Sequence, residues 1–121
     1  MAQSHDMGRQ GEILATQYLE ETGCEVLETN WHSNHQEVDI IARQGDVLLI
    51  VEVKSRSTLY HGEPELFVTR NKQRMLVKAA NHYVAWKDLD LEVRFDIITV
   101  HFRDDKQHEL RHIKNAFYPA W

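Results

Sequence analysis

The chain has 121 residues, 42% of them hydrophobic, and a single cysteine, so we expect one domain spanning residues 1–121 that folds without disulfides. The first ten residues lack a basic segment followed by an apolar core, and no apolar run approaches the ~18 residues of a membrane span, so we expect a cytoplasmic protein. The net charge of −5 argues against a nucleic-acid partner, but residues 1–53 carry −8, residues 54–87 carry +5 and residues 88–121 carry −2.

Small and apolar residues recur at spacings of three and four over residues 4–22, which predicts an amphipathic helix. A short strand is expected over residues 25–31, followed by two strongly apolar runs, EVDIIAR (37–43) and DVLLIVEVK (46–54). Residues 55–68 are expected to form a loop, and Thr69 can cap a second helix that runs to residue 86. Strands are predicted over residues 91–102 and 108–117, the last at an edge. This order predicts an α/β fold with a central mixed β-sheet flanked by helices.

The two apolar runs form a predicted hairpin that gathers polar side chains on one face. A turn at residues 44–45 places Glu37 opposite Glu52. Side chains two apart on a strand share a face, so Asp39 and Lys54 emerge beside them. The opposite face is expected to be apolar and to carry Val38, Ile40, Ala42, Val47, Leu49, Val51 and Val53.

Asp39 and Glu52 are diagonal neighbours in this register, with backbones roughly 7–8 Å apart, so both carboxylates can reach one ion. A divalent cation would remove their mutual repulsion, and all-oxygen ligands favour Mg²⁺ or Mn²⁺ over zinc. Lys54 could orient or help deprotonate an attacking water, or stabilise charge on a phosphate. The alternative is a salt bridge between Glu52 and Lys54 at a strand end, with Asp39 in a turn.

The second predicted helix offers a basic face. Arg70, Arg74 and Lys78 recur at spacings of four and form a stripe opposite the apolar side of the helix, and Lys72 lies in its first turns. Arg56 follows just beyond the predicted hairpin. These cations could contact DNA phosphates. The alternative is an ordinary solvated helix face.

The remaining candidate ligands and aromatic residues favour structural roles. His32 and His35 lie in a predicted loop without cysteine partners, so incidental surface histidines are favoured over a metal site. Four aromatic residues are expected to be core rather than a platform for stacking bases, namely Tyr83, Trp86, Phe95 and Phe102. The position of Trp31 stays open.

The combination of EVDIIA and VEVKSR resembles the metal-binding core of the PD-(D/E)XK nuclease superfamily. The chain as a whole resembles the YraN-like family of predicted bacterial endonucleases, itself considered akin to archaeal Holliday-junction resolvases. The blocks that carry the resemblance stand in the expected order: GRQGEILATQYLEETG, NW, EVDIIARQGDVLLIVEVKSR, HGEPELFVTRNKQRMLVKAANHYV, RFDIITV and HIKNAF. The resemblance implies a restriction-endonuclease-like fold and metal-dependent hydrolysis of DNA phosphodiesters, on branched DNA in the case of the resolvases.

By motif position, the resemblance implies that Asp39, Glu52 and Lys54 are catalytic and that Asp39, Glu52 and Glu12 hold Mg²⁺ or Mn²⁺. Glu12 borders the inward stripe of the first predicted helix, although the residues alone favour an exposed glutamate. A homodimer is compatible with symmetric cutting of two strands. The alternative is a catalytically inactive DNA-binding or adaptor protein that keeps the fold.

Overall fold

The computed structural model describes residues 2–57, 68–103 and 107–119, which form two helices and five strands. In chain order these are α1 (Ala2–Glu21), β1 (Glu25–Ser33), β2 (Gln36–Gln44), β3 (Val47–Ser57), α2 (Arg70–Lys87), β4 (Glu92–Phe102) and β5 (His108–Phe117). The predicted elements are all present, but β3 continues to Ser57, into the expected loop. The rest of that loop, residues 58–67, lies outside the described residues. In the described part of the chain, no helix is long and apolar enough to cross a membrane.

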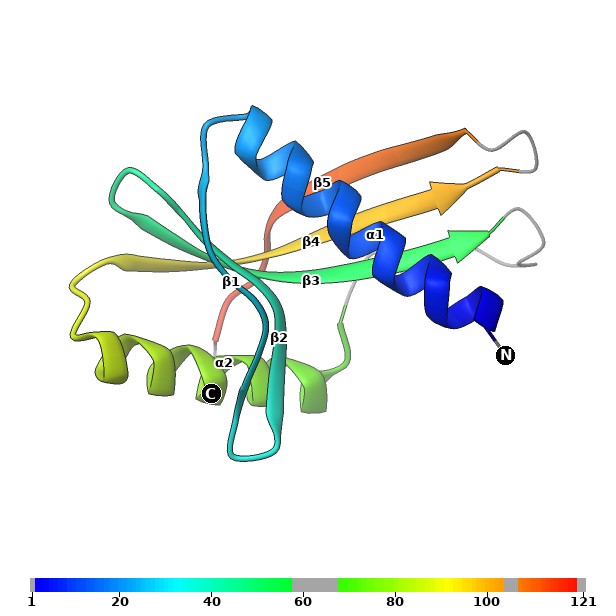
Figure 1. Ribbon diagram of the computed structural model, residues 1–121. Coiled ribbons are helices and arrows are strands. Elements are labelled where there is room, and N and C mark those ends of the chain that lie inside the picture. Colours follow the sequence, from blue (N-terminus) through cyan, green and yellow to red (C-terminus); the bar gives the residue numbers. More distant parts are fainter. Residues whose placement is uncertain (1, 58–67, 104–106, 120–121) are drawn as a thin grey trace.

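The five strands form one sheet in the order β1-β2-β3-β4-β5 (Figure 1). Among the described strands, β3 and β4 run parallel and the other neighbours run antiparallel. The parallel pair is joined by a crossover that contains α2, as the geometry of parallel strands requires. β5 lies at an edge, as predicted. The predicted α/β class is therefore confirmed, and the architecture is consistent with a restriction-endonuclease-like fold.

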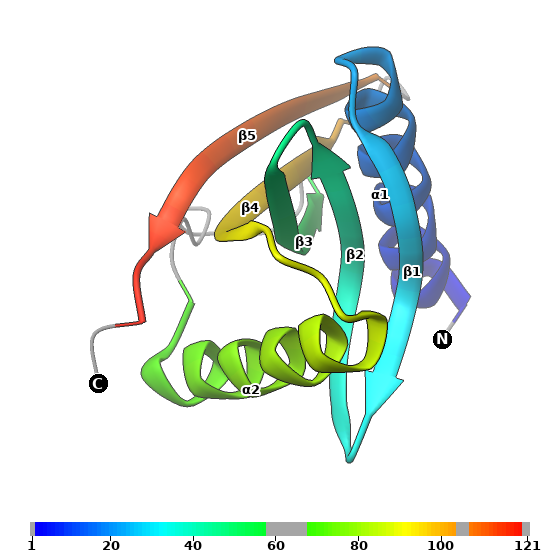
Figure 2. The same cartoon turned by 90° about the vertical axis from the view of Figure 1, so that its left-hand side faces the viewer.

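The two helices cover opposite faces of the twisted sheet (Figures 1 and 2). On one face, Ala15 and Leu19 of α1 are fully buried against β2, β3 and β4. On the other face, Leu76 and Tyr83 of α2 are buried against the same central strands. β3 is apolar because it is central and covered on both sides. Thr69 caps α2 as predicted, its hydroxyl accepting a hydrogen bond from a backbone N–H in the first turn (3.2 Å).

The hairpin of β2 and β3 turns at residues 45–46, one residue later than predicted. The last pair before the turn is Gln44 with Val47, and the first turn residue is a glycine with φ of 61°, which suits a two-residue hairpin turn. The pairing is therefore shifted by two residues, which keeps the side chains of the paired residues 40–44 and 47–51 on their predicted sides of the hairpin. Asp39 and Glu52 consequently lie across from each other rather than diagonally.

The regular pairing of β2 with β3 ends at Ile40, next to Asp39. In β1, Asn30 lies between the two residues whose partners flank Asp39, and its left-handed φ of 51° departs from the extended backbone of the strand. The predicted position of Val38 is wrong for this reason: it packs on the α2 side of the sheet, whereas Ile40 packs on the α1 side. Beyond the last regular pair of β2 and β3, the backbone N–H of Val53 donates a hydrogen bond to Oδ2 of Asp39 (2.8 Å).

Candidate functional site

Asp39 and Glu52 form a close pair of carboxyl groups where β2 separates from β3. The two carboxyl groups lie close enough that each affects the pKa of the other. Burial, and then the charge of Asp39, raises the pKa of Glu52 to about 7. Burial also raises the pKa of Asp39, against the opposing hydrogen bond from Val53. Each group therefore binds a proton more tightly than an isolated carboxyl group does.

One oxygen of this pair is poorly satisfied. Glu52 Oε1 is buried and receives no hydrogen bond from any N–H or O–H group within the described residues. The side chain of Glu52 is only 14% exposed, so water offers little compensation. A buried carboxylate oxygen without a donor is unfavourable, and it is an atom that a hard divalent cation would satisfy. The donor set of Asp39 and Glu52 thus fits Mg²⁺ or Mn²⁺.

Glu12 approaches this pair from α1. The helix passes close to β3 at Gly11, where an added Cβ would overlap Ser55 Oγ and lie 3.3 Å from Ser55 Cβ. Burial, and then the charge of Asp39, raises the pKa of Glu12, and a hydrogen bond from the Asn30 side chain opposes this. The helix therefore places Glu12 within electrostatic reach of Asp39, on the side of the site formed by α1 and β1.

The three predicted metal ligands do not lie equally close to one another. Asp39 and Glu52 are in contact, whereas Glu12 is linked to Asp39 only through its charge. Within residues 2–57, 68–103 and 107–119, no three His, Cys, Asp or Glu side chains converge so as to hold a metal ion. The structure thus supplies a two-carboxylate donor set with a third carboxylate nearby.

Two lysines act on the carboxyl pair. The positive charge of Lys54, which follows Glu52 on β3, lowers the pKa of Glu52, and the catalytic role of this lysine stays a prediction. Lys72 reaches the same group from α2, with Nζ 3.7 Å from Glu52 Oε2, and its charge lowers the pKa of both acids. The sequence placed Lys72 among the cations predicted to bind DNA. In the structure it lies at the carboxyl pair, apart from the exposed stripe.

The other cations predicted to bind DNA lie outside the carboxyl pair. Arg70, Arg74 and Lys78 are exposed on α2, on the side away from its buried residues. Arg56 is partly buried on β3, where its guanidinium donates a hydrogen bond to the carbonyl of Ser55 (2.9 Å). Their contact with DNA stays a prediction.

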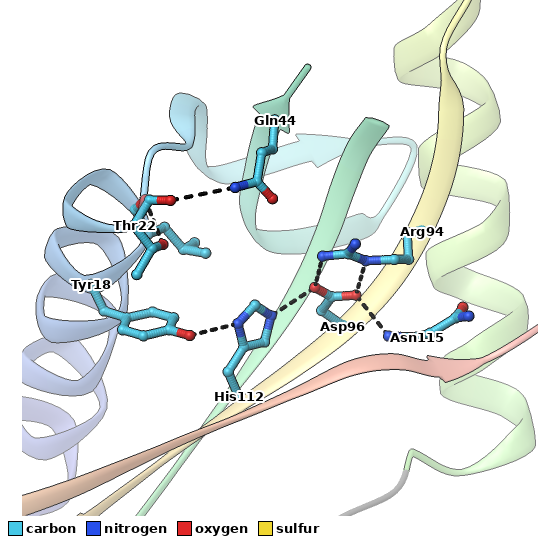
Figure 3. A network of polar contacts seen from close by, with 8 residues as sticks. Tyr18, Thr22, Gln44, Arg94, Asp96, His112 and Asn115 are labelled. Atoms are coloured by element: carbon cyan, nitrogen blue, oxygen red, sulfur yellow. Dashed lines mark hydrogen bonds and ion pairs between the residues drawn. The ribbon is translucent and has the colours of Figure 1, made fainter. Parts of the chain in front are cut away.

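A second buried carboxylate, Asp96 of β4, is surrounded by hydrogen-bond donors (Figure 3). It accepts bonds from Arg94 Nε and Nη2 (both 2.9 Å), His112 Nε2 (2.7 Å) and the N–H of Asn115 (3.0 Å). Burial alone would raise the pKa of Asp96, but these donors hold it at about 2. His112 in turn contacts the hydroxyl of Tyr18 on α1 (2.9 Å). This network ties α1 and β5 to β4, and its satisfied charge indicates a structural role.

Several of these features were missed from the sequence. The spacing did leave a signal for Lys72, which continues the buried series of Leu76, Ala79 and Tyr83 by one step of four toward the start of α2. Nothing in the sequence indicates that Asn30 bonds Glu12. The Asp96 network did leave a signal, because an aspartate inside the apolar run RFDIITV must find donors if it is buried.

The predicted surface histidines are exposed, and His32 Nε2 lies 3.7 Å from a carboxylate oxygen of Glu37. Among the aromatic residues predicted to be core, Tyr83 and Phe95 are buried. The prediction is wrong for Trp86, which is 63% exposed. Trp86 follows Tyr83 by three residues on the same side of α2, but it lies in the last turn of the helix, where its ring stacks on Trp31 of β1.

Comparison with known proteins identifies the family to which this chain is similar. The model of the uncharacterised protein family UPF0102 matches residues 11–100. A UPF0102 protein of Flavobacterium psychrophilum is 47% identical over 118 residues, which cover 98% of each chain. A UPF0102 protein of Parabacteroides distasonis is also 47% identical, over 98% of this chain and 97% of its own. One of Porphyromonas gingivalis is 39% identical, over 97% of this chain and 87% of its own.

Proposed function

This chain belongs to the uncharacterised protein family UPF0102. From the geometry of its site, we propose that it is a metal-dependent nuclease that hydrolyses DNA phosphodiesters. The observation that carries the proposal is the close, partly buried carboxyl pair of Asp39 and Glu52, with Lys54 and Lys72 beside it. Glu52 Oε1 in this pair has no hydrogen-bond donor within the described residues. Proteins of this fold class have many different functions, so the carboxyl pair supports a nuclease and the architecture alone does not.

Each residue of the site would have a distinct role in hydrolysis. Asp39 and Glu52 would hold Mg²⁺ or Mn²⁺, with Glu12 supporting the site from α1. The bound cation would stabilise the negative charge that develops on the phosphate during hydrolysis. Lys54 would orient the attacking water or donate a hydrogen bond to the phosphate. Lys72 favours the ionised form of Glu52, whose pKa would otherwise lie further above neutrality.

The substrate would be held by cations outside this centre. Arg70, Arg74 and Lys78 on α2 and Arg56 on β3 would contact phosphates, and binding would weaken as salt is raised. The proposal includes branched DNA as the substrate, a homodimer that cuts two strands symmetrically, and a location in the cytoplasm.

The test is a panel of labelled branched, nicked and linear DNAs incubated with Mg²⁺ or Mn²⁺. We expect cutting of at least one substrate by the wild-type protein and its loss in Asp39→Ala, Glu52→Ala and Lys54→Ala. Asp46→Asn removes an exposed carboxylate from the turn of the same hairpin and should cut like the wild type. Cutting that survives all three site substitutions would come from a contaminant or from another site, and the proposal would be wrong.

One observation favours a second candidate, a DNA-binding or adaptor protein without catalysis. Within the described residues, no third carboxylate lies close enough to Asp39 and Glu52 to complete a three-residue metal site. Such a protein would bind DNA through the same cations but would cut none of the panel. It would also show no gain in melting temperature in millimolar Mn²⁺, whereas a nuclease site should be stabilised by the ion.

A further inference from the structure

Trp86 presents a large aromatic ring to solvent near the C-terminal end of α2, where 63% of the residue is exposed. The ring stacks on Trp31 of β1, with centroids 6.2 Å apart and an angle of 24° between planes. Tyr83 packs against it edge-on at 5.9 Å. Tyr83 is itself fixed, because it is only 1% exposed and its hydroxyl donates a hydrogen bond to Glu28 (3.2 Å). Trp86 is thus held in place from beneath while much of its surface stays open.

The helix that carries Trp86 is basic throughout. The span Arg70–Lys87 contains five lysine and arginine residues and no acidic residue, in a chain whose net charge is −5. Lys87 Nζ lies 4.5 Å from the centre of the Trp86 ring. Charge complementarity therefore selects a polyanion as the partner of this face. Exposed Asp88 and Asp90 follow the helix at once, so its aromatic end suits a neutral group better than a phosphate.

The aromatic end and the carboxyl pair lie along the same helix. Lys72, near the N-terminal end of α2, contacts Glu52, so this end of the helix adjoins the candidate active site. Trp86 lies about 21 Å further along the helix axis, at 1.5 Å per residue. Arg74 and Lys78 are exposed between the two points. A nucleic-acid strand that binds along α2, with its phosphates at the cations on the outer side of the helix, can therefore extend to Trp86, over a length that spans about six steps of a stacked strand.

We propose that Trp86 stacks on an unpaired base of a single-stranded segment of the substrate, whose phosphates run along Arg70, Arg74 and Lys78. This inference rests on the proposed function and names the class of DNA on which it acts. In a duplex the faces of the bases are covered by their neighbours, so an exposed aromatic ring fixed from one side gains nothing there. With an unpaired base, one aromatic side chain contributes about 1–3 kcal/mol.

The experiment measures binding of a labelled single-stranded oligonucleotide by fluorescence anisotropy in EDTA, so that no cutting intervenes. We expect Trp86→Ala to weaken binding about 5- to 150-fold, while Trp86→Phe keeps most of the affinity. The matched control is Tyr118→Ala, which removes an aromatic side chain of similar exposure (68%) and should bind like the wild type. Arg74→Gln should weaken binding to every strand and reduce the salt dependence by about one phosphate contact.

Two further ligands decide whether stacking is the cause. On an oligonucleotide of the same length and charge with abasic sites, Trp86→Ala and the wild type should bind equally. The inference would be overturned if Trp86→Ala weakened binding to the abasic strand as much as to the normal strand, or if it did not weaken binding to the normal strand. Vesicles of anionic phospholipid test the other polyanion: if Trp86→Ala weakens vesicle binding and leaves the oligonucleotide unaffected, this face binds lipid and the inference is wrong.

The result can be separated from that of the nuclease test. Binding that depends on Trp86, with no cutting of any DNA, would refute catalysis and leave the stacking inference intact. Cutting that is abolished by Glu52→Ala but occurs with binding insensitive to Trp86 would support the nuclease and refute the stacking.

Discussion

The raised pKa of Glu52 makes the stability of the metal-free protein depend on pH. In the unfolded chain this carboxyl has its ordinary pKa of 4.5, whereas in the folded protein burial and Asp39 raise it to about 7. Between these values the folded state holds a proton that the unfolded state releases, so stability is fully present below pH 4.5 and is lost as pH rises through 7. The difference corresponds to about 3 kcal/mol, which is an upper value because the side chain is 14% exposed.

Glu52→Gln isolates this contribution, because the amide keeps the shape of the side chain and carries no charge. We expect the variant to be more stable than the wild type at pH 8 by up to about 3 kcal/mol and nearly equal to it at pH 4.5. The measurement is urea unfolding in EDTA at both pH values. Asp46→Asn, in the exposed turn of the same hairpin, should keep the pH dependence of the wild type.

Divalent metal provides the complementary measurement. At pH 8, Mn²⁺ at 100 times its dissociation constant should stabilise the wild type by about 2.7 kcal/mol, and Glu52→Gln by much less. The reasoning is refuted if Glu52→Gln is destabilised by the same amount at pH 4.5 and pH 8. That outcome would mean that Glu52 contributes through packing or hydrogen bonds and that its charge is not strained in the fold.

Three further predictions concern the surroundings of the site. The pKa of Asp96, held at about 2, gives stability that is present above pH 4 and lost as pH falls toward 2, so Asp96→Asn should destabilise the protein by about 2 kcal/mol at pH 7 and by less in acid, measured by urea unfolding. Gly11→Ala should force α1 away from Ser55, lowering stability by about 1–3 kcal/mol and reducing cutting, while Gly8→Ala, where an added Cβ meets nothing within 4 Å, should do neither. Lys72→Met removes a cation from Glu52, so the pH at which cutting reaches half its maximum should move upward, whereas an unchanged pH profile would contradict the contact.

Local patterns were sufficient to predict the elements and the location of the carboxyl pair. Both helices and all five strands follow from periodicity, caps and turns, and the alternation of side chains was enough to place Asp39 and Glu52 on one side of a hairpin. The register error did not matter for that result, because a shift of two residues preserves the side. The inverted position of Val38 could not be predicted, because it follows from the left-handed residue Asn30 on a neighbouring strand.

Long-range packing decided what the patterns could not. The spacing puts Lys72 on the inward face of α2 and Arg74 on the outer face, but only the packing of α2 on the sheet brings Lys72 to Glu52. Trp86 continues the inward face of α2 three residues after Tyr83, but at the end of the helix it stacks on Trp31 of β1 and stays 63% exposed. In both cases the sequence determined the helix, and the sheet beneath it determined the role of the side chain.

The clearest case is a pair of aspartates in nearly the same local sequence. Asp39 in VDIIA and Asp96 in FDIIT each precede two isoleucines on a strand of the same sheet. Asp96 meets an arginine, a histidine and a backbone N–H, and its pKa is lowered to about 2. Asp39 receives one backbone N–H and faces the carboxyl group of Glu52, and its pKa is raised. Stability alone favours the first arrangement, so the presence of the second beside two lysines supports the proposal that Asp39 and Glu52 bind a ligand.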